Sequence, residues 1–298
     1  MPFPYDSPDS YAPPTATPPT LFGVPIATEF YKVQELGVPS NIISPGTEIE
    51  FIRNSVVTGI SLIGWYSSFA GGQDPAIEVD IVKDGHEHLC TDGKVVQRLS
   101  PQDVRFTGGA YLPVWIPVDA GEKWTANVRR IPVGPAEIPL SYLLSLRVER
   151  LLEKPISIPK LTQTVIYKAR FDAGSLGSGA VHRIMRELDF RTDGVVTGIR
   201  TTAIPTSYDS SVLCFPAYED HTWDILMSGT RHLGTTGKGT SQLNTLELHN
   251  IVDWQRMWQP VDRHEKWQIM MSDNDRSEVE ARNFLVRVEE GRRPWERW

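Results

Sequence analysis

The chain has 298 residues and a formal net charge of -7. Its length exceeds the roughly 100 to 150 residues of a typical domain, so we expect two domains. The negative charge disfavours a surface built to neutralise phosphates, and no stretch approaches 18 apolar residues. Neither nucleic acid nor a membrane is therefore an expected partner.

Residues 1–21 are expected to form an extended arm. Seven of the first 20 residues are prolines, which disfavour both helix and ladder strand. The arm also lacks the basic and apolar regions of a signal peptide, which predicts that the chain is not exported by the ordinary route. Its aromatic residues Phe3, Tyr5 and Tyr11 are candidates for contacts with a neighbouring subunit.

An internal repeat organises the rest of the chain. Residues 48–60 read EIEFIRNSVVTGI, and residues 187–199 read ELDFRTDGVVTGI. Residues 115–124 read WIPVDAGEKW, and residues 258–267 read WQPVDRHEKW. The two motifs follow one another in the same order at similar offsets, which predicts a duplicated domain.

The repeat sets the expected domain boundaries. Between the two copies, Pro155 and Pro159 indicate a short, stiff linker. The predicted units are an arm at 1–21, a first domain at 22–152, a linker at 153–160, a second domain at 161–291 and a basic, aromatic tail at 292–298.

The elements within each copy are predicted to be strands. Apolar and polar residues alternate at 76–82, 145–149 and 284–289, which is the period of a half-buried strand. Only residues 100–104 suggest a helical turn. The fold class is therefore all-β, with two tandem antiparallel sandwiches; a jelly roll is the preferred topology and an immunoglobulin-like sandwich the alternative.

The WxPVDxxEKW motif is interpreted as strand, turn and strand. Its proline suits a strand edge, its aspartate can bind nearby backbone amides, and its second tryptophan can pack on the core. The signature residues are Trp115, Pro117, Asp119 and Trp124 in the first copy and Trp258, Pro260, Asp262 and Trp267 in the second. In a competing interpretation, the tryptophans form a platform that binds a host glycan.

One segment has the donor spacing of a metal site. His86, His88 and Cys90 occupy alternate positions, which would share one face of a strand and could hold zinc. The second copy shows no equivalent and no fourth ligand is recognisable, so a loop without metal is expected. Cys90 and Cys214 fall in different copies and are expected to be free.

No residues stand out as catalytic, and no cofactor is expected. The carboxylates of Asp119, Glu122, Asp262 and Glu265 recur because the motif recurs, and they do not form the acid and base pair of a glycosidase. The chain is therefore expected not to be an enzyme, with a glycoside-active enzyme as the least favoured alternative.

Residues 112–121, LPVWIPVDAG, complete the sequence evidence. Together with the arm and the tandem sandwiches, this segment resembles virion proteins of tailed bacteriophages, which share strands of an I-P-I-x-I-P-A-G type. The resemblance covers one segment per copy and departs in the second, where Arg263 and His264 replace Ala120 and Gly121.

The resemblance implies a non-enzymatic virion component, such as a head-decoration, capsid, neck or tail protein. Such a protein would bind copies of itself and other virion proteins through sheet edges and the arm. A capsid protein built from two jelly rolls is a close variant. A carbohydrate-binding adhesion protein that recognises the host is the alternative of another class.

Overall fold

The computed structural model describes residues 20–21, 23–38, 46–66, 77–104, 111–130, 140–153, 161–172, 182–205, 221–233, 243–244, 254–273 and 279–292. Nearly every described element is a strand, so the predicted all-β class is confirmed. The arm with Phe3, Tyr5 and Tyr11 lies outside the described residues, as do Cys214 and most of the linker and tail.

The first half supplies eight sandwich strands, two further short strands and one helical turn within its described residues. They are β1 Thr20–Leu21, β2 Val24–Val38, β3 Thr47–Glu50, β4 Ser55–Tyr66, β5 Ile77–Lys83, β6 Glu87–His88, β7 Cys90–Thr91, α1 Pro101–Val104, β8 Leu112–Val118, β9 Lys123–Arg130 and β10 Leu140–Leu151. The strands predicted from alternation at 76–82 and 145–149 are confirmed as β5 and part of β10, and α1 is the predicted helical turn.

Within its described residues, the second half supplies the same eight sandwich strands and one further short strand, β16. They are β11 Leu161–Asp172, β12 His182–Asp189, β13 Gly194–Pro205, β14 His221–Met227, β15 Arg231–His232, β16 Leu243–Asn244, β17 Gln255–Val261, β18 Lys266–Asp273 and β19 Val279–Arg292. The strand predicted at 284–289 lies within β19.

Each half is a sandwich of two antiparallel sheets. In the first half, a long-strand sheet with the order β2-β10-β4-β8 faces a short-strand sheet with the order β3-β9-β5-β6. In the second half, the long-strand sheet is β11-β19-β13-β17 and the short-strand sheet is β12-β18-β14-β15. Numbered along each half from its first to its eighth sandwich strand, both halves have the orders 1-8-3-6 and 2-7-4-5.

This order is that of a jelly roll, and it excludes the immunoglobulin-like alternative, whose strands follow a different order. The two halves therefore share one topology. An origin by duplication and the domain boundaries at 152 and 161 stay predictions.

The core of each half lies between its two sheets. Phe51 packs edge-on against Trp124, with ring centroids 5.1 Å apart, and Phe190 packs in the same way against Trp267 at 5.3 Å. Aromatic pairs of this geometry add to the stabilisation from their buried area. The repeated sequence thus places the same aromatic pair in each core.

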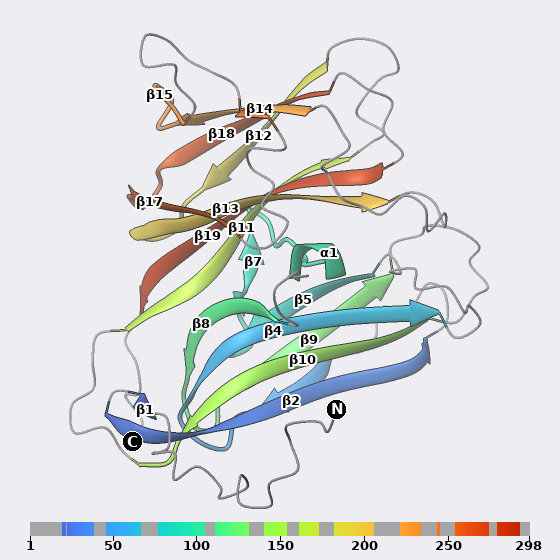
Figure 1. Ribbon diagram of the computed structural model, residues 1–298, viewed down its shortest axis with the longest axis vertical. Coiled ribbons are helices and arrows are strands. Elements are labelled where there is room, and N and C mark those ends of the chain that lie inside the picture. Colours follow the sequence, from blue (N-terminus) through green and yellow to red (C-terminus); the bar gives the residue numbers. More distant parts are fainter. Residues whose placement is uncertain are drawn as a thin grey trace, which may run out of the picture.

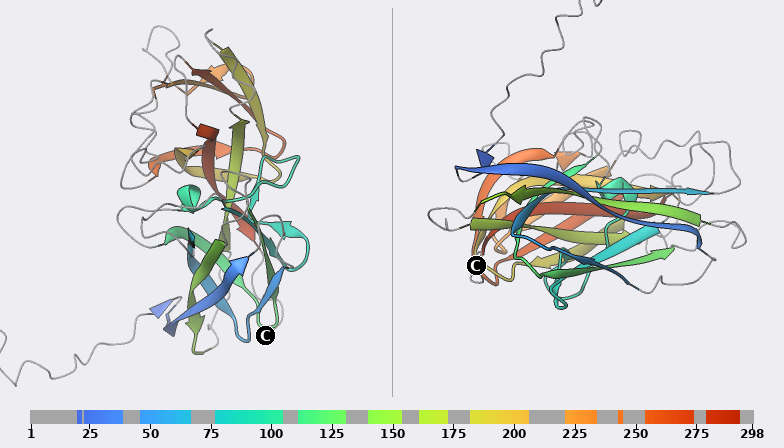
Figure 2. Two further views of the ribbon diagram at one scale, coloured as in Figure 1. Left: turned by 90° about the vertical axis from the view of Figure 1, so that its right-hand side faces the viewer. Right: turned by 90° about the horizontal axis from the view of Figure 1, so that it is seen from below.

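The two halves are stacked on one another. Figure 1 shows the second half above the first, with α1 and β7 between them, and Figure 2 shows the stack from two further sides. Within the described residues, no helix has the length and apolar character needed to cross a membrane.

Candidate functional site

The first copy of the repeated motif forms a tight turn between β8 and β9. The Glu122 carboxylate accepts a hydrogen bond from the Asp119 backbone N–H at 3.0 Å and another from the Trp124 indole Nε1 at 2.8 Å. Gly121 takes a left-handed conformation with φ of 83°, and Asn54 accepts a bond from the Ala120 N–H at 2.7 Å. One carboxylate therefore joins the turn to the core tryptophan.

The second copy forms the same turn between β17 and β18. Glu265 accepts from the Asp262 N–H at 3.1 Å and from the Trp267 indole at 3.0 Å. His264 occupies the left-handed position of the turn with φ of 68°, and the Asp193 carboxylate accepts from the Arg263 N–H at 2.8 Å. The motif thus specifies one local structure in both halves.

The glutamate of the motif also holds the turn. The carboxylates that accept hydrogen bonds from the backbone amides of Asp119 and Asp262 belong to Glu122 and Glu265. The expectation that the aspartate side chains bind nearby amides stays a prediction. The glutamate follows the aspartate by three residues, and this spacing lets its side chain reach back across the turn. The strand, turn and strand order matches the structure.

The four motif tryptophans differ in exposure. Trp124 and Trp267 are fully buried, whereas Trp115 is half-buried against a cluster that includes Val24 and Leu151. Trp258 is 76% exposed. The two halves therefore agree at the second tryptophan of the motif and differ at the first.

The motif prolines lie within the two strands that end the long-strand sheets. Pro117 belongs to β8 and is buried, whereas Pro260 belongs to β17 and is exposed. Because β8 and β17 are each last in the order of a long-strand sheet, both prolines occupy edge strands, where proline is tolerated.

The structure reveals a third repeated motif that the sequence analysis missed. His88 contacts Asp80, with Nδ1 2.8 Å from Oδ1, and His232 contacts Asp224 at 2.6 Å between the same atoms. Both pairs lie in a hairpin of the short-strand sheet. The sequence signal is the spacing D-I-x-x-x-G-x-x-H, found at 80–88 and 224–232. The expectation that the second half has no equivalent of this segment is therefore wrong for His88.

The three possible zinc donors do not converge on one point. His86 is exposed and contacts the backbone carbonyl of Asp84, while His88 contacts Asp80. Cys90 is buried, and burial raises the pKa of its thiol, which disfavours the thiolate that binds metals. Across the described ranges, no group of three or more His, Cys, Asp or Glu residues could hold a metal ion.

A strand of the first half extends a sheet of the second half. β7 pairs in parallel with β11, with Cys90 opposite Ile166 and Thr91 opposite Tyr167. The Ile166 N–H donates to the Leu89 carbonyl at 3.0 Å. Backbone hydrogen bonds thus join the two jelly rolls directly.

A buried polar network lies beside this strand pair. The Asp103 carboxylate, in α1, accepts from Lys168 Nζ at 2.7 Å and from Asn283 Nδ2 at 3.2 Å, and also from the Thr202 hydroxyl. These partners come from three neighbouring strands, β11, β19 and β13, and none of the four residues is more than 4% exposed. α1 is therefore fixed against the outer face of the second long-strand sheet.

The network controls the ionisation of Asp103. Burial by itself raises the pKa of this carboxyl, but the charge of Lys168 and the hydrogen bonds from Lys168, Thr202 and the Ser100 N–H outweigh burial. The pKa of Asp103 is consequently held below its ordinary value, and the carboxylate is charged at neutral pH.

Apolar contacts complete the interface. Ile166, Trp254 and Leu285 belong to the second half, yet they pack in the hydrophobic cluster of the first half. Ile166 and Leu285 lie on strands whose other face contributes to the core of the second half, so β11 and β19 are buried on both faces. The two halves are thereby packed as one body.

Two further ion pairs cross the same interface. Glu78, 1% exposed, binds Arg129 of its own half and Arg170 of the other half. Lys94 pairs with Glu187 across the outer rim of the interface. The buried charge of Glu78 helps to specify how the two surfaces fit together, because an unpaired charge there is costly.

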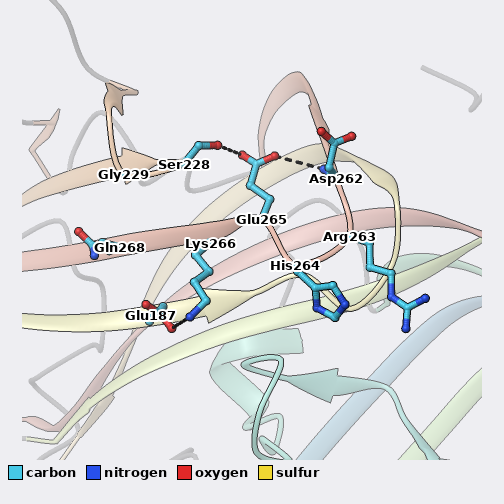
Figure 3. Close-up of a pocket in the computed structure, with 9 residues that line it drawn as sticks. All are labelled: Glu187, Ser228, Gly229, Asp262, Arg263, His264, Glu265, Lys266 and Gln268. Atoms are coloured by element: carbon cyan, nitrogen blue, oxygen red, sulfur yellow. Dashed lines mark hydrogen bonds and ion pairs between the residues drawn. The ribbon is translucent and has the colours of Figure 1, made fainter.

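A hollow of about 530 Å³ lies beside the turn of the second half and is open to solvent. Figure 3 shows Glu265 bound to Ser228 and to the turn backbone, and Lys266 paired with Glu187. The exposed side chains of Arg263 and His264 extend from the turn. The carboxylates here are held by the turn and by ion pairs, so their contacts are those of a structural turn.

The class of protein follows from these features: the chain is a tandem jelly-roll protein whose halves are joined by a buried interface. No known protein family matches the chain, and no curated protein matches it.

Similar solved structures include three of viral origin. The major capsid protein of bacteriophage PM2 is 10% identical, with a TM-score of 0.42, and the alignment covers 90% of this chain and 98% of that chain. PBCV-1 VP54, fitted into a reconstruction of the virophage Sputnik, is 7% identical, with a TM-score of 0.40 and coverages of 89% and 94%. A chain of Sulfolobus Turreted Icosahedral Virus is 9% identical, with a TM-score of 0.40 and coverages of 89% and 90%. The fold is defined by the strand order of each half and not by these alignments.

Proposed function

We infer that the chain is a non-enzymatic structural component of a virus particle. The candidate components are the capsid shell, head decoration, neck and tail of a bacteriophage. In this role the protein is made in the host cytoplasm and binds copies of itself and other virion proteins. The neighbours described above come from viral particles, but the proposal depends on this chain's own architecture.

The supporting observation is the rigid union of two jelly rolls. Jelly rolls recur in viral capsid proteins and in lectins. Here the β7–β11 pairing and the Asp103–Lys168 ion pair hold two of them in one orientation. A fixed orientation suits a building block, because an assembly with defined symmetry needs subunits of one shape.

Particle composition tests this role. Virus particles from the source of this chain should be purified on a density gradient and treated with protease to remove adhering protein. Quantitative mass spectrometry should then find the chain in many copies per particle, while a replication protein from the same source, the matched control, should be absent. Recovery of the chain only from the soluble fraction would contradict the proposed role.

The exposure of Trp258 favours a second candidate, a carbohydrate-binding adhesion protein. An exposed indole offers a flat apolar face with a polar N–H, which suits stacking on a sugar ring. A glycan array should then show binding that Trp258→Ala abolishes and that Ile52→Ser, at another exposed apolar residue, leaves intact. Equal array signals for both variants would reject this candidate.

A further inference from the structure

The outer face of the second long-strand sheet is covered by the first half of the chain. Its residues at the interface include Ile166, Lys168, Thr202, Asn283 and Leu285, and all are buried. β8 and α1 of the first half lie against this face, and β7 joins its edge by pairing with β11. Among the described residues, this contact joins the two jelly rolls within one chain.

The strand registers identify the same positions on the first long-strand sheet. Arg147 pairs with Phe30 as Arg287 pairs with Ile166, so Phe30 is the counterpart of Ile166. Ile63 is the counterpart of Thr202, because Leu143 pairs with Ile63 as Asn283 pairs with Thr202. The counterparts of a buried surface can thus be compared residue by residue.

These counterparts lie on the outer face of the first long-strand sheet, which we call the open face because the described part of the second half does not pack on it. Phe30 is 52% exposed and Ile63 is 49% exposed. Phe30 contacts Tyr111, with ring centroids 5.9 Å apart, and the open face also includes Leu143 and Lys32. Large apolar side chains that are exposed at the counterparts of a buried interface indicate a contact surface.

The edge strand that makes the contact between the halves also has a counterpart. This strand is β8 in the first half and β17 in the second. In the first half, edge strand β8 meets the second half, and the Trp115 N–H donates to Thr164 Oγ1 at 2.8 Å. In the second half, the equivalent strand β17 is the last of its sheet in the described part of the chain, and Trp258 is 76% exposed. Trp115 packs near Leu151, but Gly291 occupies the equivalent position, which leaves Trp258 without that neighbour.

The open face carries a hydrogen-bond acceptor for such an edge strand. Thr28 is the counterpart of Thr164, because Glu149 pairs with Thr28 as Glu289 pairs with Thr164. Each threonine hydroxyl donates to its paired glutamate, at 2.6 Å in the first half and 3.0 Å in the second. The Thr28 oxygen can therefore accept a bond from an edge strand, as Thr164 does.

We propose that the open face binds the β17 edge of a second copy of this chain, with Trp258 as the apolar anchor. The contact is heterologous, since it joins two different surfaces, and it repeats between copies the contact that joins the halves within one copy. Such a contact closes into a ring or continues as a filament, depending on the rotation between copies. The proposal deepens the structural role inferred above by naming its partner, a second copy.

Two variants test the two sides of the contact. Native mass spectrometry and sedimentation velocity should show that the full chain associates as its concentration rises. Phe30→Ser with Ile63→Ser, on one side, and Trp258→Ala, on the other, should each weaken association by about tenfold or more, because large anchors dominate such contacts. Ile52→Ser and Met185→Ser, at residues 67% and 51% exposed, serve as matched controls and should associate as the unmodified chain does.

Mixing the two variants distinguishes this contact from a symmetric one. The Trp258→Ala chain keeps an intact open face, and the double-serine chain keeps an intact β17 edge. At a concentration where each variant alone stays monomeric, the mixture should therefore form a one-to-one dimer and nothing larger. Thermal unfolding of each variant close to that of the unmodified chain shows that folding is retained.

Three results would overturn the proposal. They are a chain that stays monomeric up to its solubility limit, equal weakening by the control variants, and a mixture that fails to form the dimer. None of them removes the chain from purified particles, so the self-association surface and the proposed virion role can fail independently.

Discussion

The two long-strand sheets have the same strand order but different outer faces. In the second half, Lys168, Asn283 and Leu285 on that face are buried beneath the first half, and the polar members are paired. In the first half, Phe30 and Ile63 stand about half exposed at matching positions. Core positions and turns keep their residues because they specify the fold, whereas outer positions follow whatever covers them.

The largest effect is expected where the covered face holds a charge. Asp103→Asn leaves Lys168 buried without its carboxylate, so the free energy of unfolding should fall by about 3 to 5 kcal/mol. Urea unfolding at pH 7 measures it. Adding Lys168→Met removes the stranded charge, so the double variant should lose less than the sum of the two single variants. Additive losses would show that the pair is not coupled.

The same pair predicts a dependence on pH. The folded-state pKa of Asp103 is lowered, so its contribution to stability is present above the ordinary aspartate value, about 3.9, and is lost as the pH falls through the folded-state value. The stability difference between the unmodified chain and Asp103→Asn should be constant from pH 7 to 5 and shrink below about pH 4. A stability difference that stays constant below about pH 4 would contradict the charged state of Asp103.

The next-largest effect is expected at the backbone contact between the halves. A Cβ at Gly93 would overlap the carbonyl oxygen of Asp189 and would need φ of 98°. Gly93→Ala should therefore cost about 2 to 4 kcal/mol, from overpacking and strain together. Gly85→Ala is the control, because Gly85 also has positive φ but meets no atom within 4 Å. Equal losses in thermal unfolding would mean that the interface yields without cost.

A smaller effect is expected at the two motif turns. Glu122→Ala leaves the buried Trp124 indole without its acceptor and should cost about 1 to 3 kcal/mol. Glu265→Ala should cost less, since Glu265 is only partly buried and water can replace it. Urea unfolding of both variants measures the ranking, with Glu122→Gln as a milder control because it keeps an acceptor oxygen. The reverse ranking would show that burial does not set the strength of the turn.

The smallest effect is expected at the left-handed position of each turn. Gly121 suits φ of 83°, whereas His264 holds φ of 68° with a side chain that disfavours it. His264→Gly should raise stability by no more than about 1 kcal/mol, because the relief of strain is offset by a more flexible unfolded chain. Gly121→Ala should lower stability. A loss of stability on His264→Gly would indicate that the histidine makes a contact that outweighs its strain.

Local patterns in the sequence were sufficient for the strands, the single helical turn and the shared motif. Alternation identified β5, and the WxPVDxxEKW spacing placed Trp124 and Trp267 where the structure buries them. The Asp80–His88 hairpin was missed, although its spacing recurs at 224–232. The metal-donor pattern His86, His88 and Cys90 does not contain this repeat, because the partner of each histidine is an aspartate eight residues earlier.

The sequence by itself determined the all-β class, the repeat and the turns, because these depend on residues within about ten positions of one another. The tertiary structure decided which outer face is covered, that Asp103 is paired with Lys168, and that β7 of the first half pairs with β11 of the second. Asp103 and Asn283 are 180 residues apart and Lys94 and Glu187 are 93 apart, and no short-range pattern links them. Such contacts exist only once two complete sandwiches pack together, which is why the interface and the open face became visible in the folded chain alone.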